Sequence, residues 1–169
     1  MANTRHTTFQ GNPLTLLGPE LNIGQPAPDF TVLANNLTPV HLSDYAGKTI
    51  LISAVPSLDT GVCDTETRRF NQEAAGLGPD TVILTISMDL PFAQGRWCGA
   101  AGIDRVVTLS DHRDASFGNA YGVLIKELRL LARAIFVVDN KGILRYSQLV
   151  REMTHEPDYN AVIKAVKAL

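Results

Sequence analysis

Short β-branched apolar runs alternate with longer amphipathic stretches along this chain, a pattern that predicts strands interleaved with helices. We expect strands at 30–33, 40–42, 49–55, 81–87, 106–109, 134–138 and 143–149. We expect helices at 61–75, 91–100, 115–121 and 157–168, and one helical turn capped by Ser43 and Asp44 and ended by Gly47. This order of elements predicts an α/β domain with a mixed central sheet flanked by helices.

The first residues predict an additional hairpin. Two short runs, 7–10 and 14–17, flank Gly11 and Asn12, a two-residue turn with glycine in the first position. Pro13 has no N–H and would confine this hairpin to the edge of a sheet. The length of the chain is typical of one domain, so we expect 1–169 to form a single domain with 1–20 as a hairpin extension.

Composition narrows the class of protein. The chain is 45% hydrophobic, has a formal net charge of -2 and contains no basic run, which argues against nucleic acid or an anionic membrane as partner. No apolar stretch approaches the ~18 residues of a membrane span, and the polar segment 1–6 is unlike a signal peptide. A cytoplasmic location is therefore expected. Two cysteines are too few for a secreted disulfide scaffold.

The stretch 49–63 carries the clearest chemical signal. Pro56 ends an apolar strand because it cannot donate a ladder hydrogen bond, and Asp59 and Thr60 are residue types that cap helices. Cys63 then falls in the first turn of a helix, beside unpaired backbone N–H groups and the positive end of the helix dipole. Both features favour a thiolate, so Cys63 is predicted to be a nucleophile rather than an inert buried thiol.

Ionisation alone does not make a cysteine a fast catalyst, because the gain in thiolate is nearly cancelled by the loss of nucleophilicity. Other groups must position and polarise the substrate, and Pro56, Thr60 and Arg133 are the candidates. Arg133 begins an apolar strand. An arginine there either extends to water or supplies a fixed cation beside Cys63, and the pattern leaves both possibilities open.

The second thiol, Cys98, lies well inside its expected helix, where a core position near Trp97 is the simplest interpretation. It could also condense with a sulfenic acid formed on Cys63. Both helices would begin at the carboxyl edge of the sheet, where α/β folds bind ligands, if strands 49–55 and 81–87 are parallel neighbours. A disulfide needs Cα atoms roughly 4.4–6.8 Å apart, so we expect one or both helices to unwind locally.

Other kinds of chemistry have weaker support. The chain has no Cys-x-x-Cys motif, and its cysteines and four histidines are too widely spaced for a zinc site. A cysteine hydrolase would need a histidine base, for which His112 with Asn119 or Asn140 is the available combination. A disulfide oxidoreductase or redox sensor that reacts slowly with peroxide, and a non-enzymatic binding module, remain as alternatives.

Two segments resemble a known family. The sequence Pro-Ser-Leu-Asp-Thr-Gly-Val-Cys at 56–63 resembles the peroxiredoxin signature Pro-x-x-x-Thr/Ser-x-x-Cys. Residues 89–98 resemble the segment around the resolving cysteine of bacterial thiol peroxidases, which are atypical two-cysteine peroxiredoxins. The likeness also covers 9–13, 131–139 and 156–159. It therefore extends over almost the whole chain.

This resemblance implies a thioredoxin-like fold with an N-terminal β-hairpin, and the reduction of hydrogen peroxide and organic hydroperoxides. It implies that Cys63 is the peroxidatic cysteine and that Cys98 is the resolving cysteine of an intrasubunit disulfide. Thr60 and Arg133 would bond the thiolate and the peroxide, and Pro56 would shield them from water. The family is typically a homodimer reduced by thioredoxin, with no metal or organic cofactor.

The link 126–129 departs from the family pattern, since some relatives have a longer Gly-Pro loop at this point. We therefore expect the size preference for the peroxide and the dimer contact to differ from those relatives.

Overall fold

A seven-stranded mixed sheet forms the centre of the computed structural model, which describes residues 4–169. Its strands lie in the order β10-β9-β5-β6-β7-β3-β4. They are β3 (Thr31–Leu33), β4 (Pro39–His41), β5 (Thr49–Ala54), β6 (Thr81–Ser87), β7 (Val107–Ser110), β9 (Ala134–Val138) and β10 (Leu144–Leu149). Strands β5, β6 and β7 are parallel and the other pairs are antiparallel, which confirms the expected mixed sheet.

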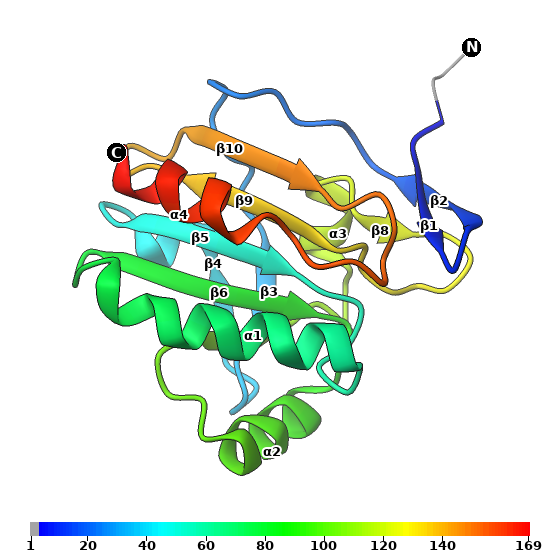
Figure 1. Ribbon diagram of the computed structural model, residues 1–169, viewed down its shortest axis with the longest axis horizontal. Coiled ribbons are helices and arrows are strands. Elements are labelled where there is room, and N and C mark those ends of the chain that lie inside the picture. Colours follow the sequence, from blue (N-terminus) through cyan, green and yellow to red (C-terminus); the bar gives the residue numbers. More distant parts are fainter. Residues whose placement is uncertain (1–3) are drawn as a thin grey trace.

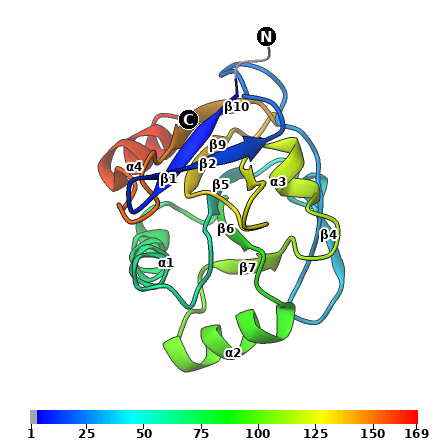
Figure 2. The same cartoon turned by 90° about the vertical axis from the view of Figure 1, so that its right-hand side faces the viewer.

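Helices cover both faces of this sheet (Figures 1 and 2). Helices α1 (Gly61–Glu73) and α4 (Tyr159–Lys167) lie on one face, and the short α3 (Ser116–Ala120) lies on the other. Helix α2 (Pro91–Ala101) packs against β7, and two 3-10 turns, η1 (Leu42–Tyr45) and η2 (Ala74–Gly76), complete the elements around the main sheet. None of the helices within 4–169 has the length and apolar character needed to cross a membrane.

The core is divided by the sheet into two apolar layers. Phe30, Phe117 and Phe136 belong to the layer on the α3 side, whereas Phe70 and Val162 belong to the layer under α1 and α4. Because β5 and β6 face both layers, they carry near-continuous apolar runs instead of an alternating pattern. Their parallel pairing confirms the expected arrangement, in which α1 and α2 begin beyond the carboxyl ends of neighbouring strands.

A second, three-stranded sheet is built from β1 (His6–Phe9), β2 (Asn12–Leu17) and β8 (Leu124–Ile125), in the order β1-β2-β8. It lies at the end of the main sheet where β5 and β6 finish (Figure 1). The expected N-terminal hairpin is thus confirmed from residue 4 onward, and residues 1–3 of the expected extension lie outside the described residues. The sequence did not predict β8, which is too short to show a pattern.

Two local expectations were wrong. The hairpin turn is Gln10-Gly11 and not Gly11-Asn12, because Gln10 and Gly11 both take positive φ values, 51° and 79°, and Asn12 pairs with Phe9. The η1 turn is capped by His41 and not by Ser43 or Asp44: Asp44 lies inside the turn, and its carboxylate accepts the His41 N–H at 2.8 Å. The remaining elements begin and end within about two residues of the expected positions.

Candidate active site

Cys63 lies in the first turn of α1, as the sequence predicts. Thr60 is the N-cap, and its hydroxyl accepts the Cys63 N–H at 3.4 Å and donates to the Ser57 carbonyl at 3.0 Å. In this arrangement Thr60 bonds the backbone of Cys63, not its sulfur. The cysteine is 0% exposed and packs with Val55 and Leu58. Its sulfur is therefore shielded from bulk water while it lies at the positive end of a helix.

Arg133 lies directly beside this sulfur. It is 1% exposed, so the structure excludes the alternative in which the side chain extends to water. The Arg133 Nη2 donates to the Cys63 Sγ at 3.4 Å and to the Met153 carbonyl at 2.9 Å. Its Nε donates to the same carbonyl at 3.1 Å. Nη1 donates to the Glu66 carboxylate at 2.6 Å. Because the guanidinium is planar, these anchors fix the direction of the N–H that meets the sulfur.

A buried carboxylate balances the arginine. Glu66 is 0% exposed, and its second oxygen accepts the Ser53 hydroxyl at 2.8 Å. Burial raises the pKa of Glu66, and the bonds from Arg133 and Ser53 oppose that rise. Burial alone would lower the pKa of Arg133, but the neighbouring Cys63 and Glu66 raise it above its ordinary value. The site thus holds a permanent cation against the sulfur, where it stabilises negative charge.

Sequence reasoning missed Glu66 and the Met153 carbonyl, which bind Arg133, and Ser53, which donates to Glu66. Glu66 had a detectable signal, since it follows Cys63 by three residues and therefore lies on the same side of a helix. Ser53 is a polar residue within an apolar strand, which is only a weak signal for a buried polar partner. The Met153 contact uses a backbone oxygen, for which no residue type is a signal.

A cavity of about 240 Å³ opens at this site, and both Thr60 and Arg133 line it. The buried Pro56 also lines the cavity, so all the candidate residues apart from the two cysteines meet at one hollow. Its other walls are largely apolar and consist of Phe9, Gly61, Val62, Leu128, Leu130, Met153 and Thr154. The link 126–129 thus contributes Leu128 to the cavity wall.

Cys98 is not brought against Cys63. Its half-buried thiol lies 3.4 Å from the Thr108 hydroxyl on β7, and both cysteines are free. The residue of α2 that packs against Cys63 and its neighbours is Trp97, whose indole N–H donates to the Asp64 carboxylate at 3.0 Å. The structure therefore holds Cys63 and Cys98 as separate thiols with different neighbours.

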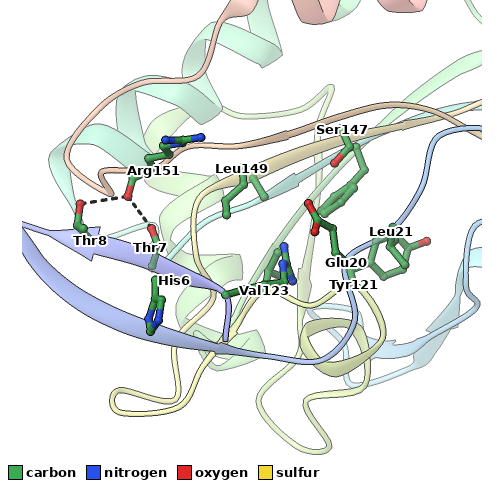
Figure 3. Close-up of a pocket in the computed structure, with 13 residues that line it drawn as sticks. His6, Thr7, Thr8, Glu20, Leu21, Tyr121, Val123, Ser147, Leu149 and Arg151 are labelled. Carbon is green, nitrogen blue, oxygen red and sulfur yellow. Dashed lines mark hydrogen bonds between the residues drawn. The ribbon is translucent and has the colours of Figure 1, made fainter. Parts of the chain in front are cut away.

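Other possible sites lack the necessary chemistry. A larger cavity of about 480 Å³ lies between the hairpin and strands β9 and β10 (Figure 3), but neither cysteine lines it. Its Arg5 side chain already donates to the carbonyls of Pro19 and Gly122. Within 4–169 the recorded hydrogen bonds of Cys63 involve no histidine, so the hydrolase interpretation with His112 gains no support.

The arrangement defines a class of protein: a thioredoxin-like domain whose reactive thiol opens a helix and faces a buried arginine. The Redoxin family model matches residues 22–163. Thiol peroxidases of Bacillus subtilis strain 168 and Staphylococcus aureus strain MRSA252 are 60% and 58% identical over 162 and 160 residues, covering 96% and 95% of this chain and 96% of each relative. The chain therefore belongs to the redoxin family and, within it, to the thiol peroxidases.

Solved structures agree with this assignment. The crystal structure of a peroxiredoxin-like protein from Aquifex aeolicus superposes with a TM-score of 0.91 at 42% identity, covering 97% of this chain and 96% of that chain. A thiol peroxidase from Chromobacterium violaceum gives a TM-score of 0.85 at 20% identity, covering 96% of both chains, which supports the fold alone. The predicted thioredoxin-like fold is confirmed.

Proposed function

We propose that this protein is a thiol-dependent peroxidase that reduces hydrogen peroxide and organic hydroperoxides at Cys63. The observation that carries this proposal is the Arg133 Nη2 atom, which lies 3.4 Å from the Cys63 sulfur on a guanidinium fixed by Glu66 and the Met153 carbonyl. A fixed cation at this place stabilises the attacking thiolate and the negative oxygen that leaves.

In the first step the Cys63 thiolate attacks one peroxide oxygen. An S–O bond forms, the O–O bond breaks, and the departing oxygen takes a proton to leave as water or an alcohol. The sulfur is oxidised by two electrons to a sulfenic acid and the peroxide is reduced. Arg133 and Thr60 would hold the two oxygens, and Pro56 would exclude water from the sulfur.

In the second step Cys98 acts as the resolving cysteine of the same chain. Its sulfur forms an S–S bond with Cys63, the S–O bond breaks, and water leaves. Because α1 and α2 hold the two thiols apart, we propose that one or both helices unwind locally at this stage. Hydrogen exchange in 61–70 and 91–101 should become faster in the oxidised form, and equal protection in both forms would refute the unwinding.

An external dithiol must then reduce the disulfide, and we propose thioredoxin for this role. The proposal includes a homodimer in the cytoplasm and a single functional domain from 1 to 169, with no metal or organic cofactor. Family membership supports these assignments, since they are typical of the peroxiredoxins that this chain resembles.

The test is a coupled assay of the whole cycle. Reduced protein receives hydrogen peroxide or cumene hydroperoxide together with thioredoxin, thioredoxin reductase and NADPH, and a parallel assay supplies glutathione with glutathione reductase. We expect continuous NADPH oxidation with thioredoxin and much less with glutathione. Thiol loss no faster than that of free cysteine would instead favour a disulfide oxidoreductase or redox sensor.

A further inference from the structure

We infer that Glu152 is a positioning residue for the peroxidase reaction: it fastens the N-terminal hairpin to the loop 151–154 and thereby fixes the Met153 carbonyl that aims Arg133 at Cys63. This inference rests on the proposed function of Cys63. It gives the hairpin, which lies outside the main sheet, a part in the chemistry.

The Met153 carbonyl is an essential anchor because two of the Arg133 donors meet there, at 2.9 and 3.1 Å. The loop that presents it has left the main sheet. The Val150 N–H donates to the carbonyl of Arg133, the residue before β9, at 2.9 Å, and this is the last recorded backbone bond between the two chain segments. Beyond residue 150 the loop must find its hydrogen-bonding partners elsewhere.

The hairpin strand β1 supplies these partners. The Thr8 N–H donates to the Arg151 carbonyl at 2.7 Å, and the Met153 N–H donates to the Thr8 carbonyl at 2.8 Å. Figure 3 shows the hydroxyls of Thr7 and Thr8 directed at the same Arg151 oxygen, at 3.0 and 3.1 Å. The peptide units on both sides of residue 152 are therefore fixed by β1.

Glu152 extends this attachment to the hairpin turn. Its carboxylate accepts the Thr8 hydroxyl at 2.6 Å, the Gln10 N–H at 2.8 Å and the Gly11 N–H at 3.1 Å. It also accepts the Thr154 hydroxyl at 3.0 Å, so it joins the turn to the loop on both sides of Met153. These bonds, with that from Thr8 the largest cause, lower the pKa of Glu152 to about 2 and keep the carboxylate ionised at working pH.

The turn depends on this carboxylate. Gln10 has a φ of 51°, a left-handed conformation that is unfavourable for a residue with a Cβ atom. Two successive N–H groups that converge on one anion offset that strain. Without Glu152 we expect the turn to relax, β1 to loosen from the loop, and the Met153 carbonyl to lose its fixed position.

Glu127 offers a matched control on the same hairpin. It is an exposed glutamate whose two oxygens accept the Thr15 N–H of β2, at 3.1 and 2.9 Å. None of its recorded bonds reaches the loop 151–154. Glu127→Ala therefore weakens the hairpin without touching the Met153 carbonyl.

The experiment compares Glu152→Ala, Glu127→Ala and the unaltered protein by stopped-flow measurement of Cys63 oxidation by hydrogen peroxide across pH. We expect Glu152→Ala to lower the second-order rate constant at pH 7 about tenfold. The pH dependence of the rate constant should also shift to higher pH, since a misaligned arginine stabilises the thiolate less. Glu127→Ala should stay within about twofold of the unaltered protein with the same profile, because Arg133 keeps its anchors.

A second variant keeps the test decisive if Glu152→Ala folds poorly. Thr8→Val keeps the branched shape of the side chain but removes the hydroxyl that bonds Glu152 and Arg151, and it should lower the rate constant about threefold. Equal rates and profiles in all variants would overturn the inference, as would equal losses in the Glu152 and Glu127 variants. If the unaltered protein itself fails to react with peroxide, the proposed function fails instead.

Discussion

The surroundings of the two cysteines differ in every respect that matters for their chemistry. Cys63 is fully buried on a helix whose N-cap, Thr60, accepts the Cys63 N–H, and its sulfur meets the buried Arg133. Cys98 is half-buried in a helix that has no side-chain cap, and the partner of its sulfur within 4–169 is the neutral hydroxyl of Thr108. One thiol is held ready for reaction where it lies. The other would have to move with its helix in the proposed second step.

Two hydrogen bonds join the two helices in addition to the packing of Trp97. Trp97 donates to Asp64, and Arg68 donates to the Ala101 carbonyl at 3.3 Å. Both lie near the surface, where such bonds stabilise by only about 1 kcal/mol each. Buried, fixed contacts thus surround the Cys63 sulfur, whereas the hydrogen bonds that join α2 to α1 lie near the surface.

The largest effect should come from replacing each cysteine in turn by serine. Cys63→Ser should abolish peroxide reduction, because a serine hydroxyl at this position does not become a comparable nucleophile. Cys98→Ser should still reduce about one peroxide per subunit and then stop as the sulfenic acid. Peroxide consumption per mole of protein measures both, and undiminished turnover in Cys63→Ser would contradict the assignment.

The next effect concerns the arginine. Arg133→Lys keeps the charge but cannot bond Glu66, the Met153 carbonyl and the sulfur together, so the rate constant of Cys63 oxidation should fall roughly 100-fold. Arg113→Lys is the matched control, since Arg113 and its partner Asp114 both have side chains that are 53% exposed. A loss of less than about threefold in Arg133→Lys would show that the fixed fork is unimportant.

A smaller effect, of opposite sign, is expected at the second cysteine. Trp97→Phe removes the indole donor to Asp64, so α2 should open more easily and the disulfide should close about fivefold faster once Cys63 is oxidised. Quenching the reaction at set times and separating the thiol and disulfide forms measures this rate. Phe92→Leu, at a position 68% exposed on the same helix, should leave it unchanged. Slower closure in Trp97→Phe would argue against opening of α2.

A last prediction concerns stability instead of rate, and it compares two buried carboxylates. Glu66 is paired with an arginine, whereas Asp111, beyond β7, is held by the N–H groups of Phe117 and Gly118 at 3.0 and 2.8 Å. Burial raises the pKa of Asp111 to about 6 from 3.8. The folded state then binds the proton more tightly, so this group stabilises most below pH 3.8 and its contribution falls by about 3 kcal/mol as the pH rises to 6.

Urea unfolding of the unaltered protein and Asp111→Asn at pH 4 and pH 7 isolates this contribution. The amide in Asp111→Asn keeps one of the two oxygens that accept the Phe117 and Gly118 N–H groups. The lost bond changes the free energy of unfolding by the same amount at both pH values. Relative to the unaltered protein, the variant should therefore gain stability between pH 4 and pH 7. A relative loss over that interval would reverse the assigned direction of the pKa.

Most of the fold could be predicted because its signals are local. The parallel strands β5 and β6 are continuous apolar runs, and the sequence around Pro56 and Thr60 ends a strand and begins a helix within a few residues. The hairpin turn was predicted one residue late, and the acceptor of its Gln10 and Gly11 N–H groups is Glu152, which lies far away in the sequence. A local pattern cannot contain that information.

The candidate site could also be predicted only where its signals are local. The position of Cys63 followed from helix capping, and the burial of Arg133 settled a question that the strand pattern left open. The partners that aim the arginine come from three distant segments, and one of them is the backbone oxygen of Met153. Such contacts arise only when β5, α1 and the loop after β10 come together in the folded chain.

In the proposed cycle Cys63 reacts first and Cys98 resolves the product. The most direct measurement mixes fully reduced protein with one equivalent of hydrogen peroxide and follows free thiols and peptide masses over time. We expect one added oxygen on Cys63, followed by the loss of both thiols and a Cys63–Cys98 cross-linked peptide. Oxygen added to Cys98 while Cys63 remains a thiol, or both thiols unchanged, would contradict this cycle.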